Sequence, residues 1–237
     1  FLASCSQNSP GGTLKPALSV PRPNRISLFT HTNTSRSASF TFTNNFDTST
    51  SYTVTESASF LTITSGASGV LGVNRSARVG VRGTCGATPG QFAAIVTITT
   101  PNDVETVKVT LYCSAYDIQL IFNSNVSTAR RAVFTAAASR WSQLVIGDVA
   151  NVALNKAANA CGAGEPAFNA TVDDVVIYAS VQPIDGVGGI LGSAGPCFIR
   201  TAGGLTIFGT MRFDSADVAN LEAGGTFDEV ILHEMGH

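Results

Sequence analysis

The last twelve residues of the chain, TFDEVILHEMGH, contain the pattern His-Glu-x-x-His, with His233 and His237 four positions apart. On a helix, side chains at i and i+4 lie one turn apart on the same side, so both imidazoles can bind one metal ion. Imidazole nitrogens are common ligands of Zn²⁺, and Glu234 would stand beside the metal. The motif therefore predicts a Zn²⁺ site with His233 and His237 as metal ligands.

Glu234 is the candidate catalytic residue of this motif. Zinc lowers the pKa of a bound water to about 7, from about 15.7 in bulk. The carboxylate would take the proton of that water as the water attacks a peptide carbonyl, and would then pass it to the leaving amine. The expected function is that of a zinc-dependent metalloendopeptidase acting on a protein or peptide substrate. The alternative interpretation of the motif is a surface helix with two unrelated histidines.

The residues around the motif predict the helix that must carry it. Thr226 and Glu229 have the spacing of a capping box. Phe227, Val230 and Ile231 recur at helical spacing, which turns one apolar side toward the core. A helix that begins near Thr226 would therefore hold the histidines at a fixed place on the protein.

The rest of residues 115–237 is expected to alternate strands and helices. Trp141, the only tryptophan of the chain, is expected to pack in the core. The glycine-rich segment Asp185–Pro196 misses the spacing of a phosphate-binding loop, so we expect a structured loop. The expected elements are a strand at Ile118–Phe122, a helix capped by Ser127 or Thr128 and running to Leu144, strands at Asp173–Val181 and Leu205–Phe213, and a short helix with Asp214 as N-cap that runs through Glu222.

From about residue 118 onward the sequence resembles leishmanolysin-like zinc peptidases, a branch of the metzincins. The matching stretches are FTAAASRW, LVIGDV, DDVVIYASVQPIDGVGGILGSAGP, GTMRFDSAD and VILHEMGH. The resemblance implies the same roles for His233, His237 and Glu234, with a third His ligand and a Met-turn beyond His237. It also implies that Leu205–Phe213 is an edge strand that pairs with extended substrate.

The first half has a different pattern. Apolar and polar residues alternate in about seven short segments separated by turn residues, which predicts an immunoglobulin-like β-sandwich. Its single histidine, His31, has no Cys or carboxylate near it in sequence, so it is expected to be a surface histidine or a histidine with satisfied hydrogen bonds and not a metal ligand. The expected strands are Ile26–Thr30, Ser37–Thr43, Ser51–Thr55, Phe60–Thr64, Ala77–Arg82, Phe92–Thr99 and Val104–Tyr112.

The five cysteines of the chain give an indication of its cellular location. One disulfide in each half, Cys85–Cys113 and Cys161–Cys197, would suit an exported protein, while free buried thiols are the alternative. Cys5 follows Leu-Ala-Ser, which is similar to the lipobox of bacterial lipoproteins. Cys5 is then either a lipid anchor after signal-peptide removal or an incidental residue of a frayed terminus. The expected location is extracellular or at a cell surface.

Composition limits the remaining function classes. Only 13% of the 237 residues are charged and the net charge is −2, so there is no basic excess for nucleic-acid binding. Residues 1–113 carry 8 basic and 4 acidic side chains (+4), whereas residues 114–237 carry 6 and 12 (−6). This asymmetry favours two domains of different character.

We therefore expect a multi-domain chain. A signal-peptide remnant and tether over residues 1–24 would precede an all-β immunoglobulin-like sandwich over residues 25–114. The α/β (α+β) N-terminal subdomain of a metzincin peptidase would occupy residues 115–237. The alternative function is a cell-surface adhesion or binding protein with an inactive peptidase-like domain; the reading frame beyond His237 and the activity of Glu234→Ala distinguish the two.

Overall fold

The computed structural model of the chain describes residues 18–20 and 22–237. Most of the expected tether, and Cys5 within it, lies outside these residues. The chain divides into two compact units. The first unit holds the described residues up to Leu28, Arg36–Gly83 and Ala93–Thr110, and the second holds Phe29–Ser35, Thr84–Phe92 and Leu111–His237.

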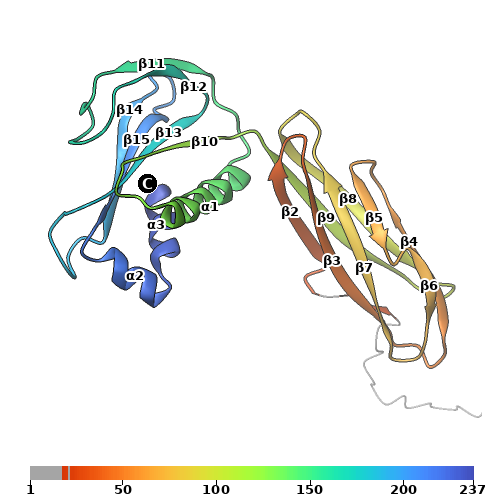
Figure 1. Cartoon of the computed structure of the whole chain (residues 1–237). Coiled ribbons are helices and arrows are strands. Elements are labelled where there is room, and N and C mark those ends of the chain that lie inside the picture. Colours follow the sequence, from red (N-terminus) through yellow and green to blue (C-terminus); the bar gives the residue numbers. More distant parts are fainter. Residues whose placement is uncertain (1–17, 21) are drawn as a thin grey trace, which may run out of the picture. The chain divides into compact units, whose positions relative to one another are not determined.

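Strands β1–β9 form an immunoglobulin-like β-sandwich of two sheets, with the strand orders β1-β3-β7-β5 and β2-β9-β8-β4-β6 (Figure 1). All seven segments expected from alternation are strands, and β1 and β6 are two further ones. The bounds are β1 Leu18–Ser19, β2 Arg25–His31, β3 Ser35–Asn44, β4 Thr50–Glu56, β5 Leu61–Ser65, β6 Ser68–Leu71, β7 Ser76–Thr84, β8 Gly90–Thr99 and β9 Val104–Ser114.

The sandwich core consists of alternate residues of these strands. Val96 and Ile98 of β8 are fully buried, and so are Val79 and Val81 of β7, because side chains two apart in a strand point to the same face. Phe42 is also buried in this core. Period-two alternation therefore identified both the strands and the side that faces inward.

Residues 115–237, which we call the mixed-sheet region, hold a four-stranded sheet with the order β10-β13-β15-β14. The pairs β10–β13 and β13–β15 are parallel, and β14 is antiparallel to β15. A separate hairpin consists of β11 and β12. The bounds are β10 Ile118–Phe122, α1 Thr128–Leu144, β11 Val152–Lys156, β12 Phe168–Val172, β13 Val175–Gln182, β14 Gly192–Ile199, β15 Thr206–Asp214, α2 Val218–Gly224 and α3 Phe227–Met235.

Both faces of this sheet are covered, which explains the uninterrupted apolar run of β13. Its residues Val175, Ile177, Ala179 and Val181 belong to one core cluster, with Phe134 of α1 and Ile231 of α3. The residues between them, Val176 and Tyr178, belong to a second cluster, with side chains of the β11–β12 hairpin. The helices and the hairpin therefore lie on opposite faces of the sheet (Figure 1).

Two expectations about the strands of this region are wrong. Strand β15 lies between β13 and β14, so Leu205–Phe213 is not an edge strand. The edges of this sheet are β10 and β14, and β14 begins inside the glycine-rich segment that was expected to be a loop. Glycine at the start of β14 lets the backbone lie close to the ring of Phe213 in β15, because a Cβ at Gly192 would lie 3.0 Å from that ring.

The expected N-cap at Asp214 is also wrong, because its carboxylate has other partners. Oδ2 of Asp214 accepts the backbone N–H groups of Ile184, Asp185 and Gly186, at 3.2, 2.8 and 2.9 Å. Helix α2 begins four residues later, at Val218, and its N-cap makes no side-chain hydrogen bond. Asp214 therefore fixes the loop after β13 instead of starting a helix.

The two expected disulfides are both present. Cys85 is bonded to Cys113, and Cys161 to Cys197. Structural disulfides form in oxidising environments, which supports an extracellular location. Among the helices of residues 18–20 and 22–237, none is long and apolar enough to cross a membrane.

Candidate metal centre

Helix α3 brings the two motif histidines together at its C-terminal end. Nε2 of His233 lies 3.2 Å from Nε2 of His237, with the two rings at 78° to each other. A tetrahedral zinc ion with Zn–N bonds of about 2.0–2.1 Å separates two such nitrogens by about 3.3 Å. The same distance suits a hydrogen bond between one protonated and one unprotonated nitrogen. Both exposed imidazoles therefore already have the spacing that a shared cation requires.

The position of α3 is fixed by its apolar side. Phe227 is buried at the first turn and Ile231 one turn later, in the core cluster that joins the helices to the sheet. Gly225 has a φ of 69°, a left-handed conformation that ends α2 and lets the chain turn into α3. The expected capping box is wrong, because Thr226 makes no side-chain capping hydrogen bond. Burial and the glycine turn, rather than a cap, start this helix.

Glu234 lies between two hollows of the surface. On one side a cavity of about 250 Å³ is lined by Glu234, His237, Trp141 and apolar side chains of the sheet. On the other side a more open groove is lined by His233 and Glu234 together with Ile190, Leu191 and Val230. The carboxylate therefore adds negative charge next to the two imidazoles, which favours a cation there.

The described residues supply only these two close nitrogen ligands around α3. In residues 18–20 and 22–237, three potential ligand atoms gather within 4.8 Å of one another at a different place, formed by Asp148, Asp173 and Asp174. The candidate centre therefore has His233 and His237 as its protein ligands.

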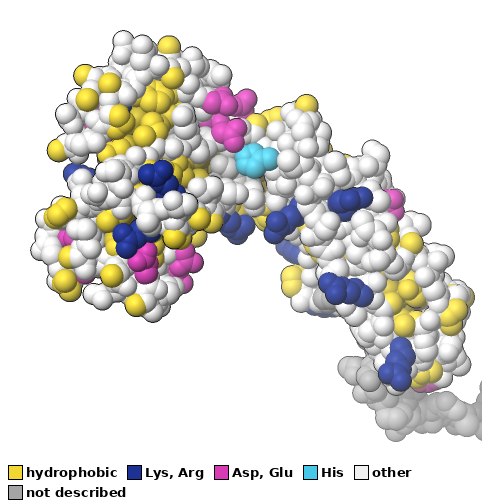
Figure 2. All heavy atoms as spheres, in the orientation of Figure 1, with side chains coloured by type: hydrophobic (Ala, Val, Ile, Leu, Met, Phe, Trp, Pro, Cys, Tyr) yellow, Lys and Arg dark blue, Asp and Glu magenta, His cyan; other side chains and the backbone are white. Residues whose placement is uncertain are grey.

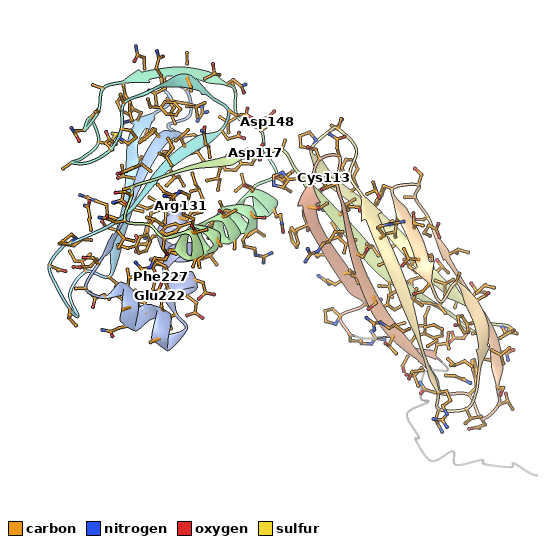
Figure 3. All side chains as sticks on the ribbon, in the orientation of Figure 1. Cys113, Asp117, Arg131, Asp148, Glu222 and Phe227 are labelled. Carbon is orange, nitrogen blue, oxygen red and sulfur yellow. A yellow bond between two sulfur atoms is a disulfide. The ribbon has the colours of Figure 1, made fainter. Side chains whose placement is uncertain are left out.

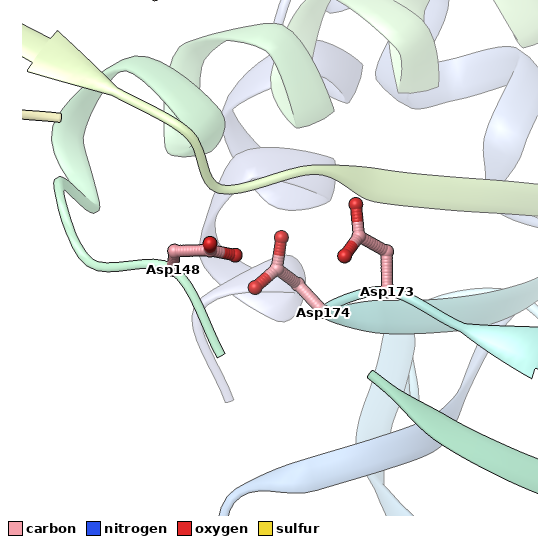
Figure 4. A group of neighbouring side chains, drawn as sticks. All are labelled: Asp148, Asp173 and Asp174. Carbon is pink, nitrogen blue, oxygen red and sulfur yellow. The ribbon is translucent and has the colours of Figure 1, made fainter. Parts of the chain in front are cut away.

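The three aspartates have a structural explanation (Figure 4). Asp174 is buried, and its two oxygens accept the N–H groups of Asp117 at 2.7 Å and Val149 at 2.8 Å. Burial raises the pKa of Asp174, which these two hydrogen bonds partly offset. Figure 3 labels Asp117 and Asp148 near the start of β10. The group therefore joins two loops to the first residues of β13.

Sequence reasoning missed such buried carboxylates throughout the mixed-sheet region. Asp217, which is 3% exposed, accepts the N–H of Gly188, and Asp214 is fully buried. Asp214 is the last residue of β15 and Asp217 directly precedes α2, in the sequence FDSAD, where aspartate usually indicates a helix cap or a solvated turn. Their partners lie 28 to 30 residues earlier, a separation that no local pattern indicates.

The other site expectations have mixed outcomes. His31 is the last residue of β2 and is half-buried. Trp141 is half-buried on α1 and lines the cavity beside Glu234. The lipid anchor expected at Cys5 lies outside the described residues.

Comparison with known proteins gives a match for the sandwich. Residues 21–114 match the family model of the viral BACON domain. No curated protein matches the chain. Similar solved structures include PapD-like domain 7 of human CEP192, at 10% identity and a TM-score of 0.37, over 49% of this chain and 100% of that one. The MSP family member WR4 of C. elegans gives 10% and 0.30, over 42% and 100%, and the E. coli chaperone DraB gives 13% and 0.34, over 41% and 55%.

These findings contradict the expected resemblance to leishmanolysin-like peptidases. The family model that matches is that of a viral BACON domain, over residues 21–114, and not that of a metzincin. The expectation of a zinc metalloendopeptidase is therefore wrong. The assignment of residues 115–237 to a metzincin subdomain finds no support either. The role of Glu234 as a general base stays a prediction. The physical reason is that His-Glu-x-x-His specifies one helical turn with two convergent imidazoles, and that turn alone does not specify a reaction.

Proposed function

We propose that the chain is an extracellular binding protein whose mixed-sheet region holds a divalent metal ion, Zn²⁺, between His233 and His237. The observation that carries this proposal is the 3.2 Å separation of the two Nε2 atoms on the last turn of α3. The two disulfides support an extracellular location. The metal would supply a Lewis-acidic binding point at the surface, and the chain's own residues would orient it.

Each residue of the centre has a distinct part in this proposal. The two imidazoles would each donate a nitrogen lone pair to the ion. The carboxylate of Glu234 would make the electrostatic potential at the site more negative, without being one of the two nitrogen ligands. The apolar side of α3 holds the donors in place before the metal arrives, because Phe227 and Ile231 are buried in the core.

Metal titration of the whole chain tests the proposal. Co²⁺ replaces Zn²⁺ as a probe because its visible absorption reports ligand number, and calorimetry with Zn²⁺ gives the stoichiometry. We expect one ion per chain, with at least a tenfold loss of affinity in His233→Ala and in His237→Ala. His31→Ala is the matched control, since His31 is the remaining histidine of the chain, and it should bind like the wild type. Equal affinity in all four proteins would contradict the proposal.

A second candidate function belongs to the sandwich. Strand β6 ends the sheet order β2-β9-β8-β4-β6, so among the described residues no strand pairs with its outer edge, and Val70 on it is 76% exposed. An edge strand with an exposed apolar side chain is a template for adding a further strand. We infer that an extended polypeptide segment of a protein partner pairs with β6.

Selection of displayed peptides tests this second candidate. Peptides selected on the wild-type chain should lose most of their binding to Val70→Lys, because a lysine on an edge strand opposes strand addition. Val104→Lys is the matched control, since Val104 is 57% exposed but lies in β9, which has β2 and β8 on either side. Peptides that bind both variants equally well would contradict the assignment to β6.

A further inference from the structure

We propose that Trp141 is the positioning residue of the two-histidine centre: its indole holds the last turn of α3, and thereby His233 and His237, in the metal-binding arrangement. This inference rests on the proposed metal-binding function. Trp141 lies on α1, more than 90 residues before the motif, and neither its sequence position nor its expected place in the core indicates this role.

The first contact is a hydrogen bond to the helix end. Nε1–H of Trp141 donates to the backbone carbonyl of Leu232 at 3.0 Å. Leu232 directly precedes His233 and is among the last four residues of α3, whose carbonyls lack a full set of intrahelical partners. An external donor at this place opposes fraying of the turn that carries His233.

The second contact is a close approach to Gly236. A Cβ built on Gly236 would lie 2.8 Å from Cζ2 of Trp141, closer than such atoms come in folded proteins. The φ of Gly236 is −75°, a right-handed conformation that any residue adopts. The indole ring is therefore the nearest obstacle to a Cβ here, with the carbonyl oxygen of His233 next at 3.2 Å, and the backbone conformation is none.

Together the two contacts hold both sides of the motif. Leu232 precedes His233, and Gly236 precedes His237, which lies beyond the end of α3 at Met235. The N–H of His237 donates to the carbonyl of Glu234 at 3.2 Å, and the indole packs against Gly236, directly before His237. Both restraints act on the turn that holds His237. Partners that orient metal ligands typically change metal affinity by about 10–100-fold when removed.

Replacement of the indole in the whole chain tests the inference. Trp141→Leu should weaken Co²⁺ binding at least tenfold and change the visible Co²⁺ spectrum, while Trp141→Phe, which keeps a ring against Gly236 but loses the N–H, should have an intermediate effect. Gly236→Ala should weaken binding in the wild-type background and add little in the Trp141→Leu background, since the clash is then gone. Independent, additive losses in that double variant would overturn the inference.

Two further measurements separate positioning from stability and from the metal proposal. Leu154→Ala removes a side chain from the hairpin cluster on the other face of the sheet, so it lowers stability without touching α3. Its Co²⁺ affinity should stay at the wild-type value, and an equal loss there would overturn the positioning role. Without metal, the amides of residues 233–237 should exchange faster in Trp141→Leu than in the wild type, and at the wild-type rate in Leu154→Ala. If the wild type binds no Co²⁺, the metal proposal fails, whereas the exchange result still decides whether Trp141 holds this turn.

Discussion

The sandwich and the mixed-sheet region differ in what their interiors contain. In the part of the chain that the structure describes, the fully buried charged side chains all belong to the mixed-sheet region: Lys156, Glu165, Asp174, Asp214 and Asp217. The sandwich buries a few uncharged polar residues, such as Asn44 and Thr100. The other buried residues of its strands are apolar. The Lys and Arg side chains of the sandwich lie on its surface (Figure 2). One region is therefore organised by strand periodicity and the other also by buried carboxylates that bind distant backbone groups.

The buried ion pair of the hairpin offers the largest test of this contrast. Nζ of Lys156 lies 3.0 Å from Oε1 of Glu165, and both side chains are almost fully buried. Lys156→Ala leaves the carboxylate without its partner, which should cost about 3–5 kcal/mol of unfolding free energy. Urea unfolding followed by the fluorescence of Trp141 measures this loss.

Two controls accompany that variant. Lys156→Met combined with Glu165→Leu removes both charges and should be close to neutral, because buried pairs recover little more than their desolvation cost. Arg78→Ala, an exposed cation of the sandwich, should change stability by less than about 0.5 kcal/mol. A single Lys156 variant as stable as the wild type would show that the pair does not organise the hairpin.

The two disulfides allow the regions to be separated. They close segments of similar length, with sequence separations of 28 and 36 residues. Loss of either, through paired Cys→Ser replacements, should therefore cost about 2–4 kcal/mol. Hydrogen exchange of the backbone amides should become faster in β9 when Cys85–Cys113 is removed. It should become faster in β13 when Cys161–Cys197 is removed. Deprotection of both strands by one replacement would mean that the regions unfold together.

The third test uses acid. Backbone N–H groups, that of Ala216 first and then those of Asp185, Gly186 and Ile184, lower the pKa of Asp214 to about 2 from a usual 3.8. A lowered folded-state pKa stabilises the protein above the unfolded-state value, and this contribution disappears as the pH falls from about 4 to 2. Amides 184–186 should lose protection in that window. In Asp214→Asn they should be less protected at neutral pH, and the acid step should be absent.

The smallest expected effect concerns the surface pair between α1 and α2. A hydrogen bond from Arg130 lowers the pKa of Glu222, labelled in Figure 3, but the Glu222 side chain is 40% exposed. Solvent screening limits such pairs, so Glu222→Gln should cost less than about 1 kcal/mol. The cost should shrink further in 1 M salt, where Lys156→Ala should still be strongly destabilising. Equal salt dependence of the two variants would contradict this ranking.

The same contrast explains what the sequence could predict. Alternation predicted seven sandwich strands, but β6 was missed because Ser68–Leu71 places one buried apolar residue beside glycine and serine. In the mixed-sheet region, Ser127 was correctly expected as a cap of α1, since its Oγ accepts the N–H of Arg130. The strands β11 and β12 were missed because each is only five residues long, and three apolar residues follow one another in β11. Apart from Cys5, each half contains two cysteines, and this distribution predicted both disulfides.

The candidate site was predictable only in its local part. Helical spacing correctly brought His233 and His237 together, because i and i+4 share one side of any helix. The step from that turn to peptide hydrolysis was wrong. The contact between Trp141 and Gly236 could not be predicted, because it joins residues 95 positions apart through the packing of two helices.

The Cys161–Cys197 bond has a topological consequence for the central strand of the mixed sheet. It closes a covalent ring that contains β12, β13 and most of β14, together with the loop in which Val187 is 75% exposed. A protease that cuts this loop once opens the ring without releasing either fragment. The nicked chain would migrate as a single species until a reductant separates the two fragments. Before reduction, β13 would still be paired with β10 and β15.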